Sequence, residues 1–170
     1  MCASSYDVTQ GGEKQVHQAY KFRLYPTKKQ ATLMNKSIGC SRFVFNHFLD
    51  KWNEAYETKK KGLTYNACSK QLIVLKKELE WLKEVDATSL QRSLRNVDDA
   101  FKRFFKKQND PPHFKSKRNR VQSYTSQCVN KNIEVKNNRI KLPKLGWVKF
   151  AKSREVEGKI LSATIRRNPS

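Results

Sequence analysis

The side chains of this chain that could do chemistry are mostly cations. Its 170 residues include 36 Lys and Arg against 15 Asp and Glu, a formal net charge of +21. A compact protein is destabilised by such self-repulsion, so the charge balance indicates a polyanionic partner, and we favour nucleic acid. An anionic membrane would be the competing partner, but no apolar run approaches the ~20 residues of a spanning helix. We therefore expect no membrane partner.

The carboxylates do not form a recognisable catalytic site. A two-metal nuclease needs several carboxylates that converge on paired Mg²⁺ ions. Asp98 and Asp99 are neighbours on an expected helix, where successive side chains diverge by about 100°. Glu155 and Glu157 have no other acid close to them in sequence. Each of these acids has a more ordinary role as a surface charge.

The histidines and cysteines are also isolated. Nothing in the sequence sets a nucleophile beside His17, His47 or His113, and His47 falls on an apolar helix face where we expect it to pack. The cysteines have no Cys-x-x-Cys pair, which favours free thiols in a reducing cytosol over disulfides or zinc; they are Cys2, Cys40, Cys68 and Cys128. We expect no catalytic residue, no metal ligand and no cofactor in this chain.

Helices are expected in the middle of the chain, after one strand. Tyr20, Phe22 and Leu24 alternate with cations, which is typical of a half-buried strand. Thr27 lies three residues before Gln30, the spacing of a capping box. The helix that begins there is expected to end at Gly39, and a second helix is expected from residue 41 to 56. Further helices are predicted over 64–82 and 90–105, separated by a break at 86–89.

Only strands are expected after Lys107. Alternating segments occur at 123–128, 133–135, 139–142, 146–150 and 159–166, and an Asn-rich hairpin turn is expected at 136–138. We predict an α+β fold, a small split β-barrel with an inserted helical bundle. Its expected parts are a disordered leader (1–13), the first barrel strand (14–25), the helical domain (26–110) and the rest of the barrel (111–170).

The predicted helix pair at 27–57 invites a helix-turn-helix interpretation. A recognition helix needs polar side chains on its exposed N-terminal face to read bases. The second helix of this pair opens instead with an apolar run, Phe43 to Phe45, which favours a buried core. Arg42 and Asn46 are the only candidates there, and each could equally brace the helix pair. The pattern therefore disfavours insertion of this helix into the major groove.

Several segments resemble a known family. They are Tyr-Lys-Phe-Arg-Leu-Tyr-Pro at 20–26, Gly39, Ser-Arg-Phe-Val-Phe-Asn-His-Phe at 41–48, and further stretches at 62–65, 81–85, 90–105 and 140–149. Together they resemble, over roughly residues 14–167, the N-terminal part of the OrfB/TnpB proteins of bacterial insertion sequences. These proteins were long called transposases and are understood as RNA-guided DNA endonucleases related to type V CRISPR effectors.

The resemblance implies a fold and a separate role for each of its parts. The first strand and the later strands resemble a split wedge domain, and the inserted helices resemble a recognition domain. Together they would hold a guide RNA and read a short motif beside a double-stranded DNA target. In the family, the Mg²⁺ site of a RuvC-like domain and a zinc segment lie further along the sequence. We therefore expect this chain to bind without cutting, in a bacterial cytosol or nucleoid.

The resemblance also assigns candidate residues. By motif position, Tyr65, Ser69, Gln91 and Asn130 look like the residues that read the DNA motif. Gln and Asn can bond an adenine edge in two places, and Tyr can pack on a thymine methyl. RNA and phosphate contacts are expected from a set of cations and one tyrosine that could stack a base: Lys21, Arg23, Arg42, Arg92, Arg95, Lys115, Lys117, Arg118, Arg120, Tyr124, Arg166 and Arg167. Each could instead be an ordinary cap or surface residue.

Two other functions remain open at this point. One is a free-standing DNA-binding regulator that uses the helix pair. The other is a nuclease completed by a second, RuvC-bearing chain. RNA-dependent binding favours the family function, sequence-specific duplex binding without RNA favours the regulator, and co-purification with a RuvC-bearing chain favours the completed nuclease.

Overall fold

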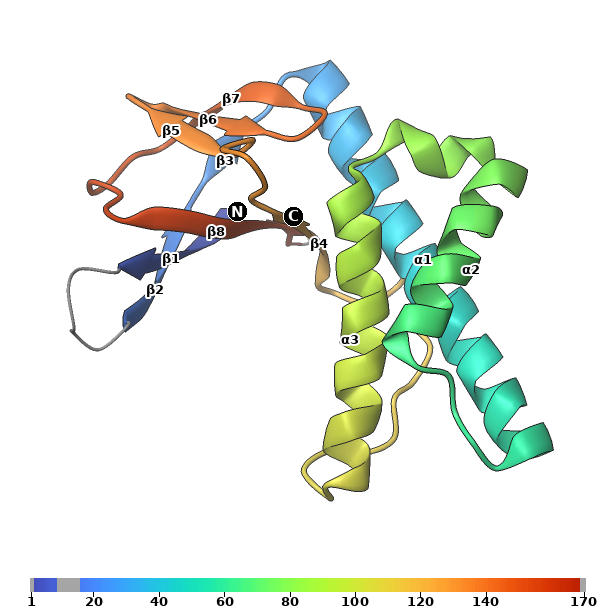
Figure 1. Cartoon of the computed structure of the whole chain (residues 1–170). Helices are drawn as coiled ribbons and strands as arrows, with labels where there is room; N and C mark the ends of the chain where they lie inside the picture. The colour runs from blue at the N-terminus through green and yellow to red at the C-terminus, as the bar shows by residue number, and fades with distance from the viewer. Residues whose placement is uncertain (1, 9–15, 169–170) are drawn as a thin grey trace. The chain divides into compact units, whose positions relative to one another are not determined.

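The structure is a computed structural model that describes residues 2–8 and 16–168. By its internal contacts the chain divides into two compact units. The β unit comprises residues 1–38 and 120–170, and the helical unit comprises residues 39–119. Helix α1 (Lys28–Lys59) begins in the β unit and continues through the helical unit. The helices and strands are labelled in Figure 1.

The β unit contains two four-stranded antiparallel sheets. The first has the strand order β2-β1-β8-β4 and the second the order β3-β7-β6-β5. The strands are β1 (Cys2–Val8), β2 (Val16–Phe22), β3 (Leu24–Tyr25), β4 (Gln122–Gln127), β5 (Glu134–Lys136), β6 (Arg139–Leu142), β7 (Gly146–Phe150) and β8 (Lys159–Arg167). The α+β class and the five predicted C-terminal strands are confirmed.

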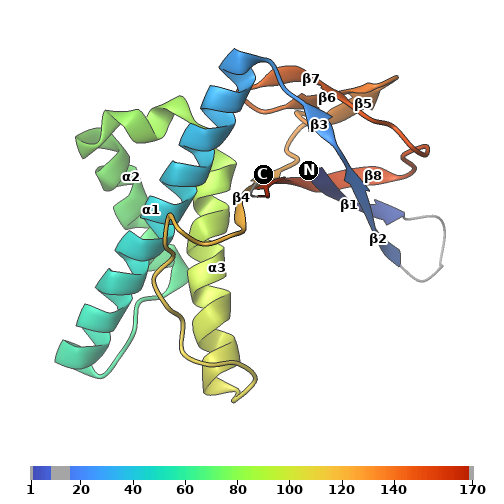
Figure 2. The ribbon, with the colours of Figure 1, turned by 180° about the vertical axis from the view of Figure 1, so that it is seen from behind.

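The sheets do not close into the predicted barrel. In the described part of the chain, β2 and β4 remain edges of the first sheet, and β3 and β5 remain edges of the second. β2 and β3 follow one another along one extended segment, separated only by Arg23, and carry the chain from one sheet to the other (Figure 2). Closure requires a continuous hydrogen-bonded ladder. Strands as short as β3 and β5, with two and three residues, offer too few bonds to provide it.

The N-terminal segment differs from the predicted disordered leader. Cys2–Val8 form strand β1, which pairs with β2 on one side and with β8 on the other. The segment has little apolar alternation of its own, so sequence periodicity could not reveal it. Its backbone is satisfied instead by ladder partners from both ends of the chain. The remaining residues of that leader, 1 and 9–13, lie outside the described residues.

The core of the β unit follows the predicted alternation. Tyr20, Phe22 and Leu24 are buried, whereas the residues between them are exposed. Met34 and Ile38, from the first turns of α1, pack into the same core. The predicted capping box is present as well, because the Thr27 amide donates to Gln30 Oε1 (3.0 Å) and the Gln30 amide donates to Thr27 Oγ1 (3.3 Å). These contacts fix where α1 begins.

The predicted helix break at Gly39 is wrong. Gly39 lies inside α1, a single helix of 32 residues, and keeps helical backbone there. Its neighbours Ile38, Cys40 and Ser41 are all buried. Packing therefore stabilises the helix on both sides of the glycine, and this outweighs the ~1 kcal/mol that glycine costs in a helix interior. No helix pair exists within residues 27–57.

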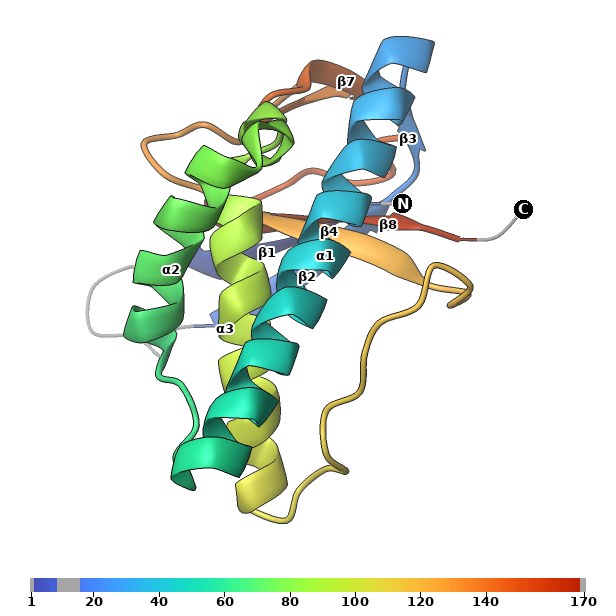
Figure 3. The ribbon, with the colours of Figure 1, turned by 90° about the vertical axis from the view of Figure 1, so that its right-hand side faces the viewer.

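The helical unit packs α1 beside two further helices (Figure 3). α2 (Tyr65–Glu78) begins at Thr64, whose Oγ1 accepts from the Ala67 amide (3.3 Å). A 3-10 helix, η1 (Glu80–Glu84), leads to α3 (Ala87–Phe105), which Asp86 caps. Leucines at helical spacing fill the interior, including Leu72, Leu82 and Leu90. Among the described residues, none of the helices combines the length and the apolar character needed to cross a membrane.

Candidate nucleic-acid interface

Three of the predicted DNA-reading residues meet in the helical unit. Tyr65 is the first residue of α2, Ser69 follows it by one turn, and Gln91 lies in the first turns of α3. The Tyr65 hydroxyl donates to Gln91 Oε1 (2.9 Å), and the Ser69 hydroxyl donates to the same oxygen (3.3 Å). All three side chains are half-buried. Two hydroxyls on one helix therefore hold the amide of a glutamine on the next.

Arg95 completes this group, which we call the Gln91 cluster (Tyr65, Ser69, Gln91 and Arg95). It lies one turn after Gln91, and its guanidinium carbon is 4.6 Å from the centroid of the Tyr65 ring. A cation over an aromatic face is held electrostatically while its N–H groups remain able to donate. The cluster thus combines an amide of fixed orientation with a positioned guanidinium, the two groups that most often contact base edges.

Asn130, the fourth predicted reader, belongs to the β unit. It is exposed and adopts a left-handed conformation (φ 50°), as does Lys131 (φ 57°). Asparagine tolerates this conformation better than most residues. Both residues line a hollow of about 1000 Å³ together with Trp147 and Lys159. The predicted readers are therefore divided between the two units.

The 107–120 loop, which carries four of the predicted RNA-binding cations, is held to α1 at Lys115. Asn46 Nδ2 donates to the Lys115 carbonyl (2.9 Å), and the Lys115 amide donates back to Asn46 Oδ1 (2.7 Å). The Lys115 ammonium lies 4.2 Å from the centroid of the Phe45 ring, and desolvation lowers the pKa of Lys115. Asn46 thus braces the 107–120 loop, whereas the sequence predicted a brace within a helix pair. Beyond Lys115 the loop exposes its other predicted cations, Lys117, Arg118 and Arg120.

The other predicted cations divide by exposure. Exposed cations of the β unit are Lys21, Arg23, Arg166 and Arg167. Arg23 lies 5.7 Å from the Tyr25 ring centroid, and Arg167 donates to Asn35 Oδ1 (2.7 Å). In the helical unit, Arg42 and Arg92 are half-buried.

Tyr124, which was predicted to stack on a base, is buried. Its side chain is only 4% exposed and belongs to the core of the β unit. The alternation of β4 places Gln122, Tyr124 and Ser126 on the inward face of the strand, which burial favours for an aromatic ring. A ring in this position offers no face to a base.

Sequence reasoning missed two groups in the β unit that join aromatic rings to cations. Arg154 lies with its guanidinium carbon 4.6 Å from the Tyr20 ring centroid. Trp147 is 39% exposed and lines two hollows together with Lys136. Arg154 lies far from Tyr20 in sequence, so no local signal reveals that contact. An aromatic residue on the polar side of an alternating strand is a signal that could have identified Trp147.

Asp98, His47 and Cys68 sit in environments that suit structural roles. Asp98 forms an ion pair with Lys102 (2.6 Å) on the surface of α3. His47 packs between Phe43 and Phe48, and burial, with a contribution from Lys51, lowers its pKa. Burial raises the pKa of the Cys68 thiol to about 11, so it stays protonated at neutral pH. Within the described residues, no three potential metal-ligating side chains come together.

A family model and two relatives of this chain point to the same protein family. A family model described as a helix-turn-helix domain, of the OrfB type, matches residues 16–61, which contain β2, β3 and α1. The chain is 35% identical over 153 residues to "Putative RNA-guided DNA endonuclease InsQ" of Escherichia coli (strain K12), a match that covers 89% of this chain and 38% of InsQ. It is 36% identical over 107 residues to a protein of Streptomyces pristinaespiralis with the same description, covering 62% of this chain and 27% of that protein.

A shorter relative is matched over most of its length. Virulence protein VsdF of Salmonella dublin is 33% identical over 96 residues, which make up 51% of this chain and 81% of VsdF. The chain spans less than two fifths of InsQ and of the Streptomyces protein. The chain belongs to the OrfB/TnpB family of insertion-sequence proteins, and its residues 16–61 match the helix-turn-helix domain of that family.

Proposed function

We propose that this chain is the nucleic-acid-binding segment of an RNA-guided protein of the OrfB/TnpB type, and that it binds a guide RNA and reads a short motif beside a DNA target. The Gln91 cluster is the observation that carries the proposal. Gln91 and Arg95 are one helical turn apart, and both are held in place by Tyr65. Such preorganisation lowers the entropy lost when side chains meet a base.

The contacts of Gln91 determine which part of it can read DNA. Its Oε1 already accepts from two hydroxyls, so the Nε2 amide is the end that donates to a base. In the major groove, purine N7, guanine O6 and thymine O4 are the acceptors for such a donor. Tyr65 and Ser69 then act by orienting Gln91. Arg95 contributes a second set of donors, directed to a guanine edge or to a backbone phosphate.

RNA is assigned to the exposed cations outside this cluster. The braced loop contributes Lys117, Arg118 and Arg120, and the β unit contributes Lys21, Arg23, Arg166 and Arg167. These side chains would neutralise phosphates, with Asn130 as a second candidate for the DNA motif. At a net charge of +21, we expect binding to weaken steeply as salt rises.

A helix-turn-helix regulator is less well supported. The matched segment contains one uninterrupted helix, α1, so no turn separates a recognition helix from a supporting one. The residues that would open the recognition helix are internal to α1, and Val44 and Phe45 are buried. They cannot read bases from that position.

The test is whether binding to DNA depends on RNA. The chain is expressed together with the genomic sequence that flanks its gene, purified with its bound RNA, and assayed for binding to a duplex library with a randomised segment. We expect enrichment of a motif that disappears after ribonuclease treatment. Enrichment that survives ribonuclease would contradict the proposal and favour the regulator.

We further propose that this segment contributes binding and no cleavage step; Asp98, one of its two neighbouring helix carboxylates, is engaged by Lys102. The same purified complex is incubated with matched duplex and Mg²⁺. We expect the duplex to remain intact. Cleavage that persists through stringent purification would overturn this assignment.

A further inference from the structure

Three aromatic rings form a stack that reaches the surface of the helical unit. Phe101 of α3 lies parallel to Trp52 of α1, with ring centroids 3.5 Å apart and planes at 15°. Tyr56, one turn further along α1, lies parallel to Trp52 on 5.3 Å centroids with planes at 14°. The Phe105 ring lies beside this stack, with its centroid 5.9 Å from that of Trp52. We call these four residues the Tyr56 stack.

The stack begins in the core and ends in solvent. Phe101 is 6% exposed, whereas Tyr56 is 42% exposed and Phe105 is 56% exposed. Gly62, in the segment after α1, approaches the Trp52 ring so closely that a Cβ there would collide with it. The inner rings are therefore fixed, and the outer ones are presented at the surface. Tyr56 and Phe105 thus present exposed aromatic surface on a fixed support.

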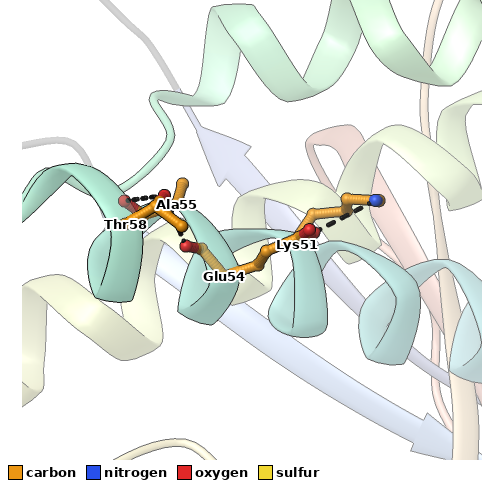
Figure 4. A network of polar contacts seen from close by, with 4 residues as sticks. All are labelled: Lys51, Glu54, Ala55 and Thr58. Atoms are coloured by element: carbon orange, nitrogen blue, oxygen red, sulfur yellow. Dashed lines mark hydrogen bonds and ion pairs between the residues drawn. The ribbon is translucent and has the colours of Figure 1, made fainter.

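Several cations lie close in sequence to the exposed end of the stack. The C-terminal ends of α1 and α3 lie at the same end of the helical unit (Figures 1 and 3). Three lysines follow Tyr56 at the end of α1, and three further cations flank Phe105; they are Lys59, Lys60, Lys61, Arg103, Lys106 and Lys107. Two carboxylates lie close to Tyr56 in sequence: Glu54 is paired with Lys51 (3.1 Å), as Figure 4 shows, whereas Glu57 is exposed beside Tyr56.

Side-chain hydroxyl and backbone amide groups cap part of both helix ends. At the end of α1, the Thr58 hydroxyl donates to the carbonyls of Glu54 (2.8 Å) and Ala55 (3.3 Å) (Figure 4), and the Lys60 amide donates to the Tyr56 carbonyl (2.9 Å). At the end of α3, backbone amides likewise satisfy the carbonyls of Lys102, Arg103 and Phe104. Several carbonyls near these two helix ends thus have partners other than the lysine and arginine side chains.

We propose that the Tyr56 stack is a second nucleic-acid site, on which an unpaired base of a single strand continues the Phe101–Trp52–Tyr56 series while the surrounding cations bind its phosphates. Flat aromatic surfaces rimmed by Lys and Arg are the recurring chemistry of single-strand binding. A protein partner with an acidic rim is the competing occupant. Nucleic acid is favoured because the parallel rings match base-stacking geometry and because the chain is cationic overall.

The test uses homopyrimidine single strands of RNA and of DNA, with a blunt duplex of equal length. These probes carry neither a guide fold nor a DNA motif, so this result is independent of the Gln91 experiment. Tyr56→Ala should weaken single-strand binding by about 5- to 100-fold, the loss expected for one stacked base, and leave duplex binding unchanged. Tyr56→Trp should retain the affinity. Comparison of the RNA and DNA arms identifies which strand the site prefers.

Matched controls separate stacking from loss of fold. Val74→Ala removes an apolar side chain of α2 that is 54% exposed and lies outside the stack, and should leave single-strand binding unchanged. Thermal unfolding of each variant checks the fold. Unchanged single-strand binding by Tyr56→Ala would overturn the proposal, and so would equal loss for single strand and duplex. Loss of affinity in Tyr56→Trp would also contradict stacking.

Discussion

At the scale of single residues, the helical unit uses polar side chains mainly to fix other groups. Gln91 is held by Tyr65 and Ser69 through one oxygen, and Asn46 holds the backbone of Lys115 through both ends of its amide. From sequence alone, each of these residues could be assigned either to recognition or to support. The structure separates the roles, since Asn46 has both ends of its amide engaged and Gln91 has one.

The brace formed by Asn46 can be tested by substitution. Asn46→Ala removes both hydrogen bonds to Lys115, and each bond in this half-exposed site is worth about 0.5–1.5 kcal/mol. We expect stability to fall by about 1–2 kcal/mol, and the 107–120 loop to be cleaved faster in limited proteolysis. Asn53→Ala, a half-buried asparagine on the same helix, is the control. Equal proteolysis of the two variants would show that Asn46 does not hold the loop.

His47 makes a prediction about pH. Burial among aromatic rings lowers its folded-state pKa below the ordinary value of 6.5. The unfolded state therefore takes up a proton more readily, and the free energy of unfolding falls as pH drops from 6.5 through the folded pKa. His47→Gln should remove this component of the pH dependence, measured by urea unfolding between about pH 7.5 and about pH 5. The exposed His113→Gln variant should retain it. Identical profiles for His47→Gln and the parent chain would contradict the assignment.

At the scale of elements, local signals predicted the starts of α1 and α2, whereas α3 begins at Ala87, inside the predicted break at 86–89. The Thr27–Gln30 capping box and the Thr64 cap are present because a cap is made by neighbouring residues. The hairpin turn at 137–138 is present for the same reason, with Asn137 in the left-handed region (φ 54°). The predicted helix end at Gly39 was wrong because a glycine ends a helix only where packing allows it. At residues 38–41, packing favours continuation of the helix.

The continuity of α1 gives a direct test. Gly39 has helical backbone, and an added Cβ would meet nothing within 4 Å. Gly39→Ala should therefore stabilise the protein by about 0.5–1 kcal/mol, measured by urea unfolding, because alanine has the higher helix propensity. Gly146→Ala is the matched control and should destabilise, since Gly146 has φ +71° although its surroundings are equally open. Destabilisation by Gly39→Ala would indicate a break in the helix at that position.

At the scale of the whole molecule, net charge and hydrophobic alternation were informative, whereas the connectivity of the strands could not be predicted. The net charge and the exposed cations indicated a polyanionic partner, and alternation located the C-terminal strands. Strand β1 and the two separate sheets could not be predicted, because both depend on which distant strands pair. The family resemblance named Tyr65, Ser69 and Gln91 together as candidate readers, whereas Arg95 was expected among the RNA contacts. Its geometry depends on the packing of α2 against α3, which no local pattern encodes.

The reading of a DNA motif by Gln91 is the central claim, and Gln91→Glu tests it most directly. The glutamate carboxylate can still accept from Tyr65 and Ser69, so the fold should persist, but it cannot donate to a base. The purified complex with its bound RNA selects from a duplex library randomised beside the target, with Asn96→Asp on the same helix as the control for added charge. We predict that the parent chain and Asn96→Asp enrich one motif. Gln91→Glu should lose the preference at one base pair of that motif, and its affinity for the duplex should fall by at least about tenfold. Enrichment of the same motif with equal affinity by Gln91→Glu would contradict the account.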